Sequence, residues 1–221
     1  MAESRAAKQA RARKILDLLD RAYPDAKIAL EFRTPFQLLV ATILSAQCTD
    51  ERVNMVTPAL FRKYPTAREL ARARPPSLEK EIRSTGFFRA KTRSLLGMAK
   101  ALVEGHGGEV PREREALVEL PGVGLKTANV VIGNAFGGRA LTVDTHVFRV
   151  SQRLGLARAD DPDEIHDQLV AILPPESLTH ASHLMITHGR RTCVARKPLC
   201  PACPVRALCP WPHKTQGPGR G

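Results

Sequence analysis

Residues 120–131 read LPGVGLKTANVV, in which two glycines flank a valine and a lysine precedes a run of small and apolar residues. The ten residues that end at Leu120, PREREALVEL, place apolar side chains at helical spacing. Pro121 and the glycines interrupt this pattern, and TANVVIGNA resumes it. The sequence therefore predicts two helices joined by a tight Gly-x-Gly turn, with Lys126 at the start of the second helix.

Two phosphate-binding motifs fit this stretch poorly. A dinucleotide fingerprint follows a strand and ends in Gly or Ala, whereas here a helix precedes the turn and Thr127 takes the last position. A P-loop has Gly, Lys and Ser/Thr in direct succession, but Leu125 separates Gly124 from Lys126. What remains is a turn with bare backbone N–H groups at a helix N-terminus, which suits a DNA phosphate.

Composition indicates a folded helical protein that binds a polyanion. The 221 residues are 43% hydrophobic and only 5% aromatic, and Ala, Leu, Arg and Glu outweigh Val/Ile/Thr runs of period two, which favours an all-α fold. The net charge is +12, from 34 Lys and Arg spread along the chain. A nucleic acid is the natural partner for such a charge, although a protein of merely basic composition stays an alternative.

The N-terminal segment predicts the first folded helix and not a targeting signal. It has no apolar h-region, and no stretch of the chain approaches eighteen apolar residues, so we expect neither secretion nor a membrane span. The segment is rich in Arg and Ala, as transit peptides are, but Ile15, Leu18 and Leu19 are spaced as on an amphipathic helix.

Capping signals divide the rest of the chain into helices. The predicted starts are Thr34 with Gln37 and Pro35, Thr66 with Glu69, Ser77, Pro111, Asp144 and Asp161. Gly86 is a predicted helix stop. The helix that follows Thr34 contains no carboxylate between Glu31 and Asp50, and its apolar spacing predicts burial.

Four of the five cysteines form a C-x6-C-x2-C-x5-C array at Cys193, Cys200, Cys203 and Cys209. A chain without an export signal and with an odd number of cysteines makes disulfides a poor explanation. Structural zinc sites made of cysteine alone usually have two C-x2-C pairs, whereas this array has one. The spacing favours a four-iron four-sulfur (4Fe-4S) cluster, with zinc as the open alternative. Cys48 is expected to be a small apolar core residue.

Arg196 and Lys197 lie in the loop between the first two of these cysteines. A metal centre that fixes the loop would present both side chains rigidly to a phosphate backbone. The alternative is that both are solvated surface charges.

Lys126 and Asp144 each have a plain and a catalytic interpretation. Lys126 could add one positive charge beside a bound phosphate, or act as an amine nucleophile. An amine attacks only when unprotonated, which for lysine requires surroundings that disfavour the ammonium, such as a helix N-terminus and partial burial. Asp144 could be only the N-cap of the next helix, and a nearby carboxylate would favour the ammonium instead.

Four stretches together resemble one family. LPGVGLKTA, VDTHVFRV, LSAQCTDERVN and the cysteine array are similar, in order and separation, to the endonuclease III family, the helix-hairpin-helix DNA glycosylases of base-excision repair. The resemblance runs from about Leu30 to Cys209.

The resemblance implies an all-α fold of two helical domains flanking a DNA-binding cleft, with a helix-hairpin-helix motif and a C-terminal iron-sulfur cluster loop. Residues 28–138 are expected to form a six-helix domain that contains the hairpin at about 112–136. Residues 1–27 and 139–221 are expected to form the helical cluster domain.

The resemblance also assigns roles. Lys126 is the nucleophile, Asp144 the catalytic aspartate, and the four cysteines hold a 4Fe-4S cluster. Gln47 fills the gap left by the flipped nucleotide, and Phe87 stands at the wedge position, where the family commonly has leucine; this departure puts the lesion preference in doubt. The expected DNA contacts are Gln47, Phe87, Gly122, Val123, Gly124, His146, Arg196 and Lys197.

The implied activity is that of a bifunctional DNA glycosylase and abasic-site lyase. It excises oxidised or ring-saturated pyrimidines from duplex DNA through a lysine Schiff base and cuts the strand 3′ of the lesion by β-elimination. We expect a cytoplasmic, nucleoid-associated monomer of prokaryotic type.

Two other functions remain as alternatives. The sibling adenine mismatch glycosylase uses a carboxylate from the helix before the SAQ stretch and lacks the hairpin lysine, whereas this chain has Lys126 and no acidic residue in that helix. A non-catalytic DNA-binding iron-sulfur protein would need only the charge and the hairpin.

Overall fold

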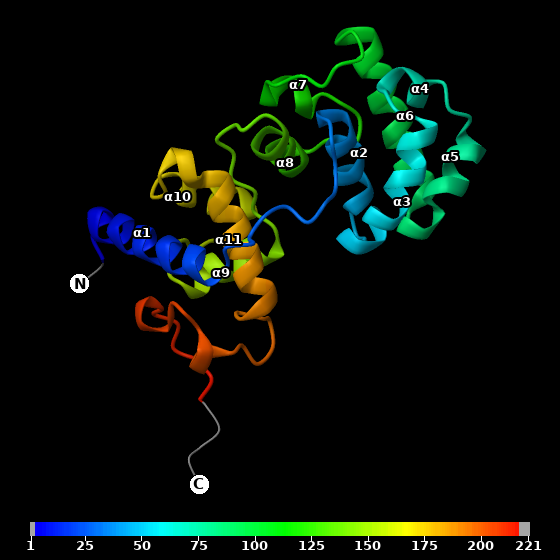
Figure 1. The fold of residues 1–221 in the computed structure, drawn as a ribbon. Coiled ribbons are helices and arrows are strands. Elements are labelled where there is room, and N and C mark those ends of the chain that lie inside the picture. The colour runs from blue at the N-terminus through cyan, green and yellow to red at the C-terminus, as the bar shows by residue number, and fades with distance from the viewer. Residues whose placement is uncertain (1–2, 217–221) are drawn as a thin grey trace. The chain divides into compact units, whose positions relative to one another are not determined.

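The structure, a computed structural model, describes residues 3–216, in which helices are joined by loops (Figure 1). Residues 3–216 contain α-helices and short 3-10 turns and no β-strand, which confirms the predicted all-α class. No helix in this range is long and apolar enough to cross a membrane.

The chain divides into two compact units, each with a hydrophobic core of its own. The hairpin unit comprises Ile28–Gly138. The cysteine unit comprises the chain up to Lys27 together with the chain from Arg139 onward.

The hairpin unit contains seven α-helices and one 3-10 turn, one helix more than the six expected. They are α2 (Pro35–Ser45), α3 (Asp50–Lys63), α4 (Ala67–Ala71), α5 (Pro75–Ile82), η1 (Arg83–Thr85), α6 (Phe88–Gly105), α7 (Arg114–Val118) and α8 (Leu125–Ala135). Two of them, α4 and α7, have only five residues each.

The predicted caps of α2 and α4 are present. The Thr34 side chain accepts a hydrogen bond from the Gln37 N–H at 3.2 Å, and Pro35 is the first residue of α2. The Gln37 side chain accepts from the Arg33 N–H at 2.8 Å, so the reciprocal bond of a capping box goes one residue further back than expected. At α4 the box between Thr66 and Glu69 is complete.

Two helix starts differ from the predictions. Helix α5 begins at Pro75 and not at Ser77, because proline at the first position needs no N–H partner and its ring already has helical φ. Helix α7 begins at Arg114, three residues after Pro111. Gly86 is the C-cap of η1 with φ +72°, as the predicted stop requires.

The core of the hairpin unit surrounds α2 and α6. Helix α2 is buried on nearly all sides, since Leu38, Leu39, Ala41 and Leu44 are fully buried, and this explains why the segment carries no carboxylate. Helix α6 contributes one buried stripe at helical spacing, consisting of Lys91, Thr92, Leu95, Met98, Ala99 and Leu102. Cys48 packs partly buried against this core, as expected.

The cysteine unit consists of four helices and three 3-10 turns within the described residues. They are α1 (Arg5–Ala22), α9 (Thr145–Arg153), α10 (Pro162–Val170), η2 (Pro175–Ser177), α11 (Leu178–Arg191), η3 (Cys200–Ala202) and η4 (Arg206–Leu208). Asp161 caps α10 as predicted.

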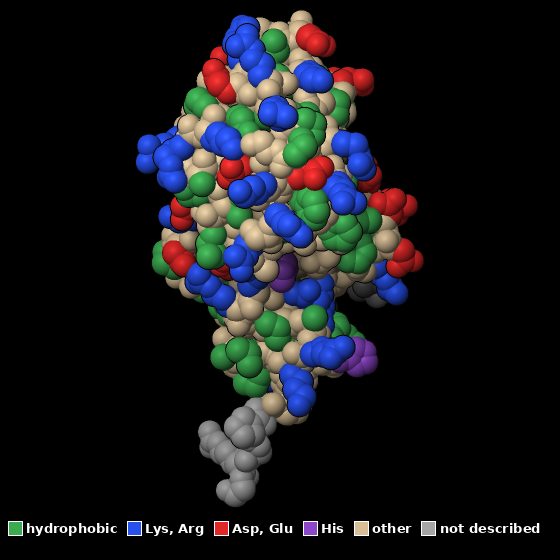
Figure 2. Space-filling model, turned by 90° about the vertical axis from the view of Figure 1, so that its right-hand side faces the viewer, with side chains coloured by type: hydrophobic (Ala, Val, Ile, Leu, Met, Phe, Trp, Pro, Cys, Tyr) green, Lys and Arg blue, Asp and Glu red, His purple; other side chains and the backbone are tan. Residues whose placement is uncertain are grey.

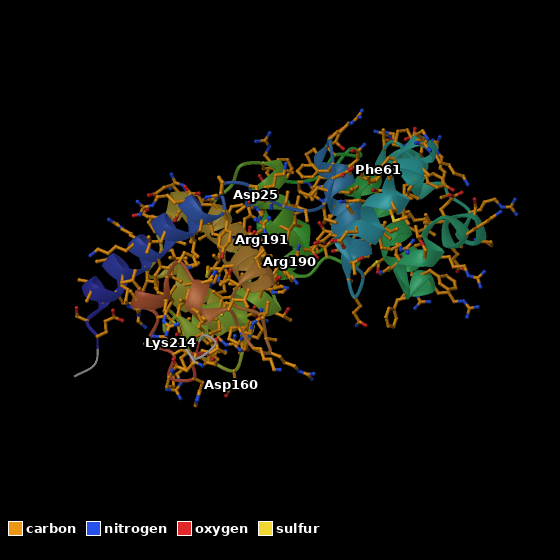
Figure 3. The ribbon with its side chains drawn as sticks, turned by 60° about the horizontal axis from the view of Figure 1, so that its bottom comes forward. Asp25, Phe61, Asp160, Arg190, Arg191 and Lys214 are labelled. Atoms are coloured by element: carbon orange, nitrogen blue, oxygen red, sulfur yellow. The ribbon has the colours of Figure 1, made fainter. Side chains whose placement is uncertain are left out.

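Contacts between α1 and α11 join the two sequence segments of the cysteine unit. Ile15 and Leu19 of α1 belong to the same buried core as Leu184 and Met185 of α11. At the end of both helices the Arg191 guanidinium binds both carboxylate oxygens of Asp25, at 2.9 and 2.5 Å (Figure 3). The N-terminal segment is therefore part of the folded unit.

Candidate active site

The predicted Gly-x-Gly turn joins α7 to α8. The Val123 N–H donates to the Leu120 carbonyl at 3.0 Å and closes the turn, while the Val123 side chain is buried. Gly122 has φ +78°, a conformation that favours glycine. Gly124 is the N-cap of α8, and no side chain caps that helix.

The two glycines of the turn have different surroundings. A Cβ on Gly122 would lie 2.5 Å from the Ser94 Cβ of α6, so the turn packs against that helix more closely than any side chain allows. A Cβ on Gly124 would have no described heavy atom within 4 Å. Because Gly124 has no side chain, the backbone at the N-terminus of α8 is open to solvent on that side.

Lys126 is the second residue of α8 and is exposed. The first turn of the helix contains no acidic residue. The partial burial that we considered for this side chain is wrong, because the short turn before α8 leaves its first turn at the surface. Lys126 thus belongs to the first turn of a helix whose N-terminal N–H groups have no side-chain cap, where the backbone provides partial positive charge.

Asp144, in the cysteine unit, is the N-cap of α9, as predicted. Its Oδ1 accepts hydrogen bonds from the His146 and Val147 N–H groups, both at 2.8 Å. The His146 imidazole Nδ1 lies 3.1 Å from a guanidinium nitrogen of Arg149. Burial lowers the pKa of His146, and the positive charges of Arg149 and Arg190 act in the same direction against an opposing effect of Asp144.

Three expected DNA contacts share an unusual backbone conformation. Gln47, Phe87 and Lys197 have φ of 51°, 47° and 53°, and within residues 3–216 no other residue except glycine has a positive φ. All three are exposed, Phe87 to 64%. Left-handed backbone costs a non-glycine residue about 1–3 kcal/mol and occurs preferentially at functional sites. Sequence patterns gave no indication of this strain.

The four cysteines of the array lie in one loop region, and the structure records them as free thiols. Cys193, Cys203 and Cys209 pack partly buried against the core of the cysteine unit. Burial raises the pKa of Cys203, and the charges of the other three cysteines raise it further. Among the residues described, no three His, Cys, Asp or Glu side chains are arranged around a position for a single metal ion.

Arg153 holds the loop in place, which the sequence did not reveal. Its guanidinium donates to the carbonyls of Val194 and Ala195 at 2.8 and 2.9 Å and lies 4.3 Å from the ring centroid of Trp211. Arg196 and Lys197, which follow directly, are exposed. The single tryptophan, two residues after the last cysteine, was the one signal in the sequence, because such a ring commonly stacks on an arginine.

A second buried network supports the cysteines from α11. His188 Nε2 lies 3.8 Å from Cys203 Sγ, and His188 Nδ1 lies 2.9 Å from the Tyr23 hydroxyl, which also bonds to Thr192. Tyr23 and His188 are far apart in sequence, so no local pattern relates them.

Comparison with known proteins shows the family to which the chain belongs. Residues 40–175 match the family model described as HhH-GPD superfamily base excision DNA repair protein. Endonuclease III of Synechocystis sp. is 53% identical over 93% of this chain and 94% of its own. Endonuclease III of Bacillus subtilis is 44% identical over 88% of this chain and 89% of its own.

Solved structures give the same result. A trapped endonuclease III–DNA covalent intermediate and a non-covalent endonuclease III–DNA complex each have a TM-score of 0.87 and 46% identity, over 91% of this chain and 95% of theirs. A thermostable thymine-DNA glycosylase, at 23% identity and a TM-score of 0.82, shares the fold. This chain therefore belongs to the HhH-GPD superfamily of base excision DNA repair proteins and, within it, to the endonuclease III family.

Proposed function

We propose that this protein, a DNA glycosylase and abasic-site lyase of base-excision repair, excises oxidised or ring-saturated pyrimidines, with Lys126 as its nucleophile. The observation that carries the assignment is the position of Lys126: an exposed amine in the first turn of α8, directly after a turn whose Gly124 leaves the helix N-terminus open. A DNA phosphate at these N–H groups would bring the sugar next to it within reach of the amine.

The proposed chemistry uses one amine for two bond cleavages. The Lys126 Nζ lone pair bonds to C1′ of the flipped nucleotide, and the base departs with the electron pair of the glycosidic bond and takes up a proton. The nitrogen loses a proton, and its lone pair then forms a C=N bond as the ring C1′–O4′ bond breaks and O4′ takes up a proton, which gives a Schiff base. Loss of a C2′ proton and cleavage of the C3′–O3′ bond then release the downstream strand, which carries the phosphate at its 5′ end.

Asp144 supplies a carboxylate for this reaction in our proposal. Positive charge develops on the sugar as the base leaves, and a fixed carboxylate stabilises it. Both N-cap hydrogen bonds of Asp144 go to Oδ1, so the cap fixes the orientation of the side chain. A fixed charge needs no reorganisation during the reaction.

We propose that Cys193, Cys200, Cys203 and Cys209 hold a 4Fe-4S cluster. The donor set fits, because all four cysteines are free thiols within one short stretch of chain. Cys200 begins η3, Cys203 and Cys209 are the C-caps of η3 and η4, and Cys193 lies two residues after α11. When bound, the cluster supplies metal–thiolate bonds that fix residues 193–209. Its role in this proposal is structural, and zinc is the alternative that iron analysis and visible absorption of the purified protein distinguish.

The DNA contacts in our proposal divide into insertion and phosphate contacts. Gln47 enters the gap left by the flipped nucleotide, and the exposed ring of Phe87 enters the stack beside it. The phosphate contacts are Gly122, Val123, Gly124, His146, Arg196 and Lys197. Lys and Arg side chains occur along the whole of the face in Figure 2, which suits a polyanion.

Borohydride trapping tests the nucleophile. The protein is incubated with duplex DNA that carries one oxidised pyrimidine or one abasic site, and reduction converts the Schiff base to a stable adduct. We expect an adduct with the parent protein and with Lys100→Ala, an exposed lysine of α6, and none with Lys126→Ala, which should still bind DNA. An adduct that persists in Lys126→Ala would remove this residue from the role.

Trapping, together with an assay of adenine release from mismatched duplexes, separates the two alternatives. A non-catalytic DNA-binding protein forms no adduct in any variant, and an adenine glycosylase releases adenine from mismatches without dependence on Lys126. We also propose a cytoplasmic location with the nucleoid, supported by the bacterial relatives and the DNA substrate.

A further inference from the structure

Lys91 is a buried lysine whose ammonium binds only main-chain atoms in the contacts recorded for it. Its side chain belongs to the inner face of α6, and the residue is 5% exposed. Nζ donates to the Leu44 carbonyl at 2.7 Å and to the Thr85 carbonyl at 2.7 Å. Burial lowers the pKa of Lys91, and Cys48 opposes this slightly. An ammonium held in this way requires acceptors at fixed positions, because an unpaired charge in the core is strongly unfavourable.

The two carbonyls precede the two turns proposed to enter DNA. Leu44 lies in the last turn of α2, three residues before Gln47. Thr85 ends η1, two residues before Phe87. The main-chain N–H of Lys91 also donates to the Phe87 carbonyl, at 3.0 Å. The Lys91 ammonium thus binds the chain just before the Phe87 turn and at the entrance to the Gln47 turn, and the N–H bond to Phe87 is the first helical bond of α6.

Both turns contain a residue in a strained backbone conformation, which persists only if neighbouring contacts stabilise it. Gln47 and Phe87 are exposed residues with left-handed backbone, which an unrestrained chain leaves readily. At the first turn, the Cys48 N–H bonds to Ser45 and not to Leu44, so the α-helical partner of the Leu44 carbonyl is absent and Lys91 replaces it. A cation at this end of α2 also meets the negative end of the helix dipole.

We propose that Lys91 is a positioning residue that ties the Gln47 turn to the Phe87 turn, so that the gap-filling amide and the wedge ring enter the duplex as one rigid pair. The inference rests on the proposed function, since it concerns how that function reaches a flipped nucleotide. It differs from a purely structural role, in which loss of Lys91 would weaken every activity of the protein alike.

The test compares two reactions of each variant. Borohydride trapping on single-stranded DNA with an abasic site needs the Lys126 amine but no insertion into a duplex. Single-turnover excision from duplex DNA needs both the Lys126 amine and insertion into the duplex. The fluorescence of a 2-aminopurine next to the lesion reports the loss of base stacking on insertion. The variants are Lys91→Met, which keeps the length and removes the donors, and Lys100→Met, the same change at an exposed site of α6.

For Lys91→Met we expect duplex excision and the 2-aminopurine signal to fall about tenfold or more, since misplacement by about 1 Å can cost ~100-fold in rate. Single-strand trapping should stay within about twofold of the parent. Lys100→Met should resemble the parent in both. The yield of trapped adduct also gives the fraction of molecules that are folded and competent. The duplex excision rate of each variant is divided by this fraction.

Lys91→Gln provides a second measure, because its shorter neutral amide still donates, and its duplex rate should lie between those of the parent and Lys91→Met. Equal losses in the two reactions, an unchanged duplex rate, or failure of both variants to fold would overturn the positioning role. Absence of trapping in the parent protein would instead contradict the proposed function itself.

Discussion

The Ser94 side chain occupies the space beside Gly122, where a Cβ would lie 2.5 Å from the Ser94 Cβ. We therefore expect Gly122→Ala to displace the turn from α6 and, because φ is +78°, to strain the backbone as well. The expected loss is about 1–3 kcal/mol in the free energy of unfolding, together with weaker DNA binding. Denaturant unfolding and a DNA titration at fixed salt measure the two effects.

Gly124→Ala is the matched control for stability. Gly124 has φ −95°, and nothing described lies within 4 Å of the new Cβ, so the free energy of unfolding should change by less than about 0.5 kcal/mol. DNA affinity should fall nonetheless if a phosphate approaches the turn there. Unchanged affinity in Gly124→Ala would contradict the proposed phosphate contact.

Asp144 allows its two roles to be separated. Asp144→Asn keeps a side-chain oxygen for the His146 and Val147 N–H groups, so stability should change little, whereas Asp144→Ala should lose about 1 kcal/mol. If the reaction needs the negative charge, both variants should lose base excision. If Asp144→Asn excises the base at the rate of the parent protein, the only role of Asp144 is to cap α9.

Arg153 should support DNA binding through the loop that it holds. Arg153→Ala removes two bonds to main-chain carbonyls and the stack on Trp211, which together contribute on the order of 2–3 kcal/mol to local order. Protease cleavage within residues 194–199 should become faster and DNA affinity should fall. Arg158→Ala, which removes an exposed arginine of the same unit, should leave the cleavage rate unchanged.

His183 makes stability depend on pH. Burial, with a smaller effect of His180, lowers the pKa of His183 to about 4, from 6.5 in the unfolded chain. Between these values the unfolded chain binds more protons, so the stability from this group is complete above pH 6.5 and is lost as pH falls toward 4. Thermal unfolding of His183→Gln should therefore vary less between pH 7.5 and 5 than that of the parent. An equal slope would contradict the assignment.

Local chemistry made several elements predictable from sequence. The caps at Thr34, Thr66, Asp144 and Asp161 depend on residues two or three positions away, so each was evident from its own segment. The Gly-x-Gly turn was predictable for the same reason. Helix starts beside prolines were less predictable, because a proline permits a helix to start nearby but does not determine which residue is the first of the helix.

Long-range contacts account for what the sequence could not reveal. Lys91 lies in a basic amphipathic stretch, and its sequence context does not distinguish it from its exposed neighbours Arg89 and Arg93. It is buried only because α6 packs against α2. The Tyr23–His188 bond spans 165 residues. Such partners depend on the tertiary fold, which no periodicity encodes.

The left-handed backbone at Gln47, Phe87 and Lys197 has a consequence for protein engineering. A thermostabilisation programme would choose these three positions early, since glycine there relieves strain and exposed side chains lose little packing when removed. Selection for heat resistance alone would thus favour deletion of the side chains that we assign to DNA. The heat tolerance of natural variants at these positions and their repair capacity should be inversely related.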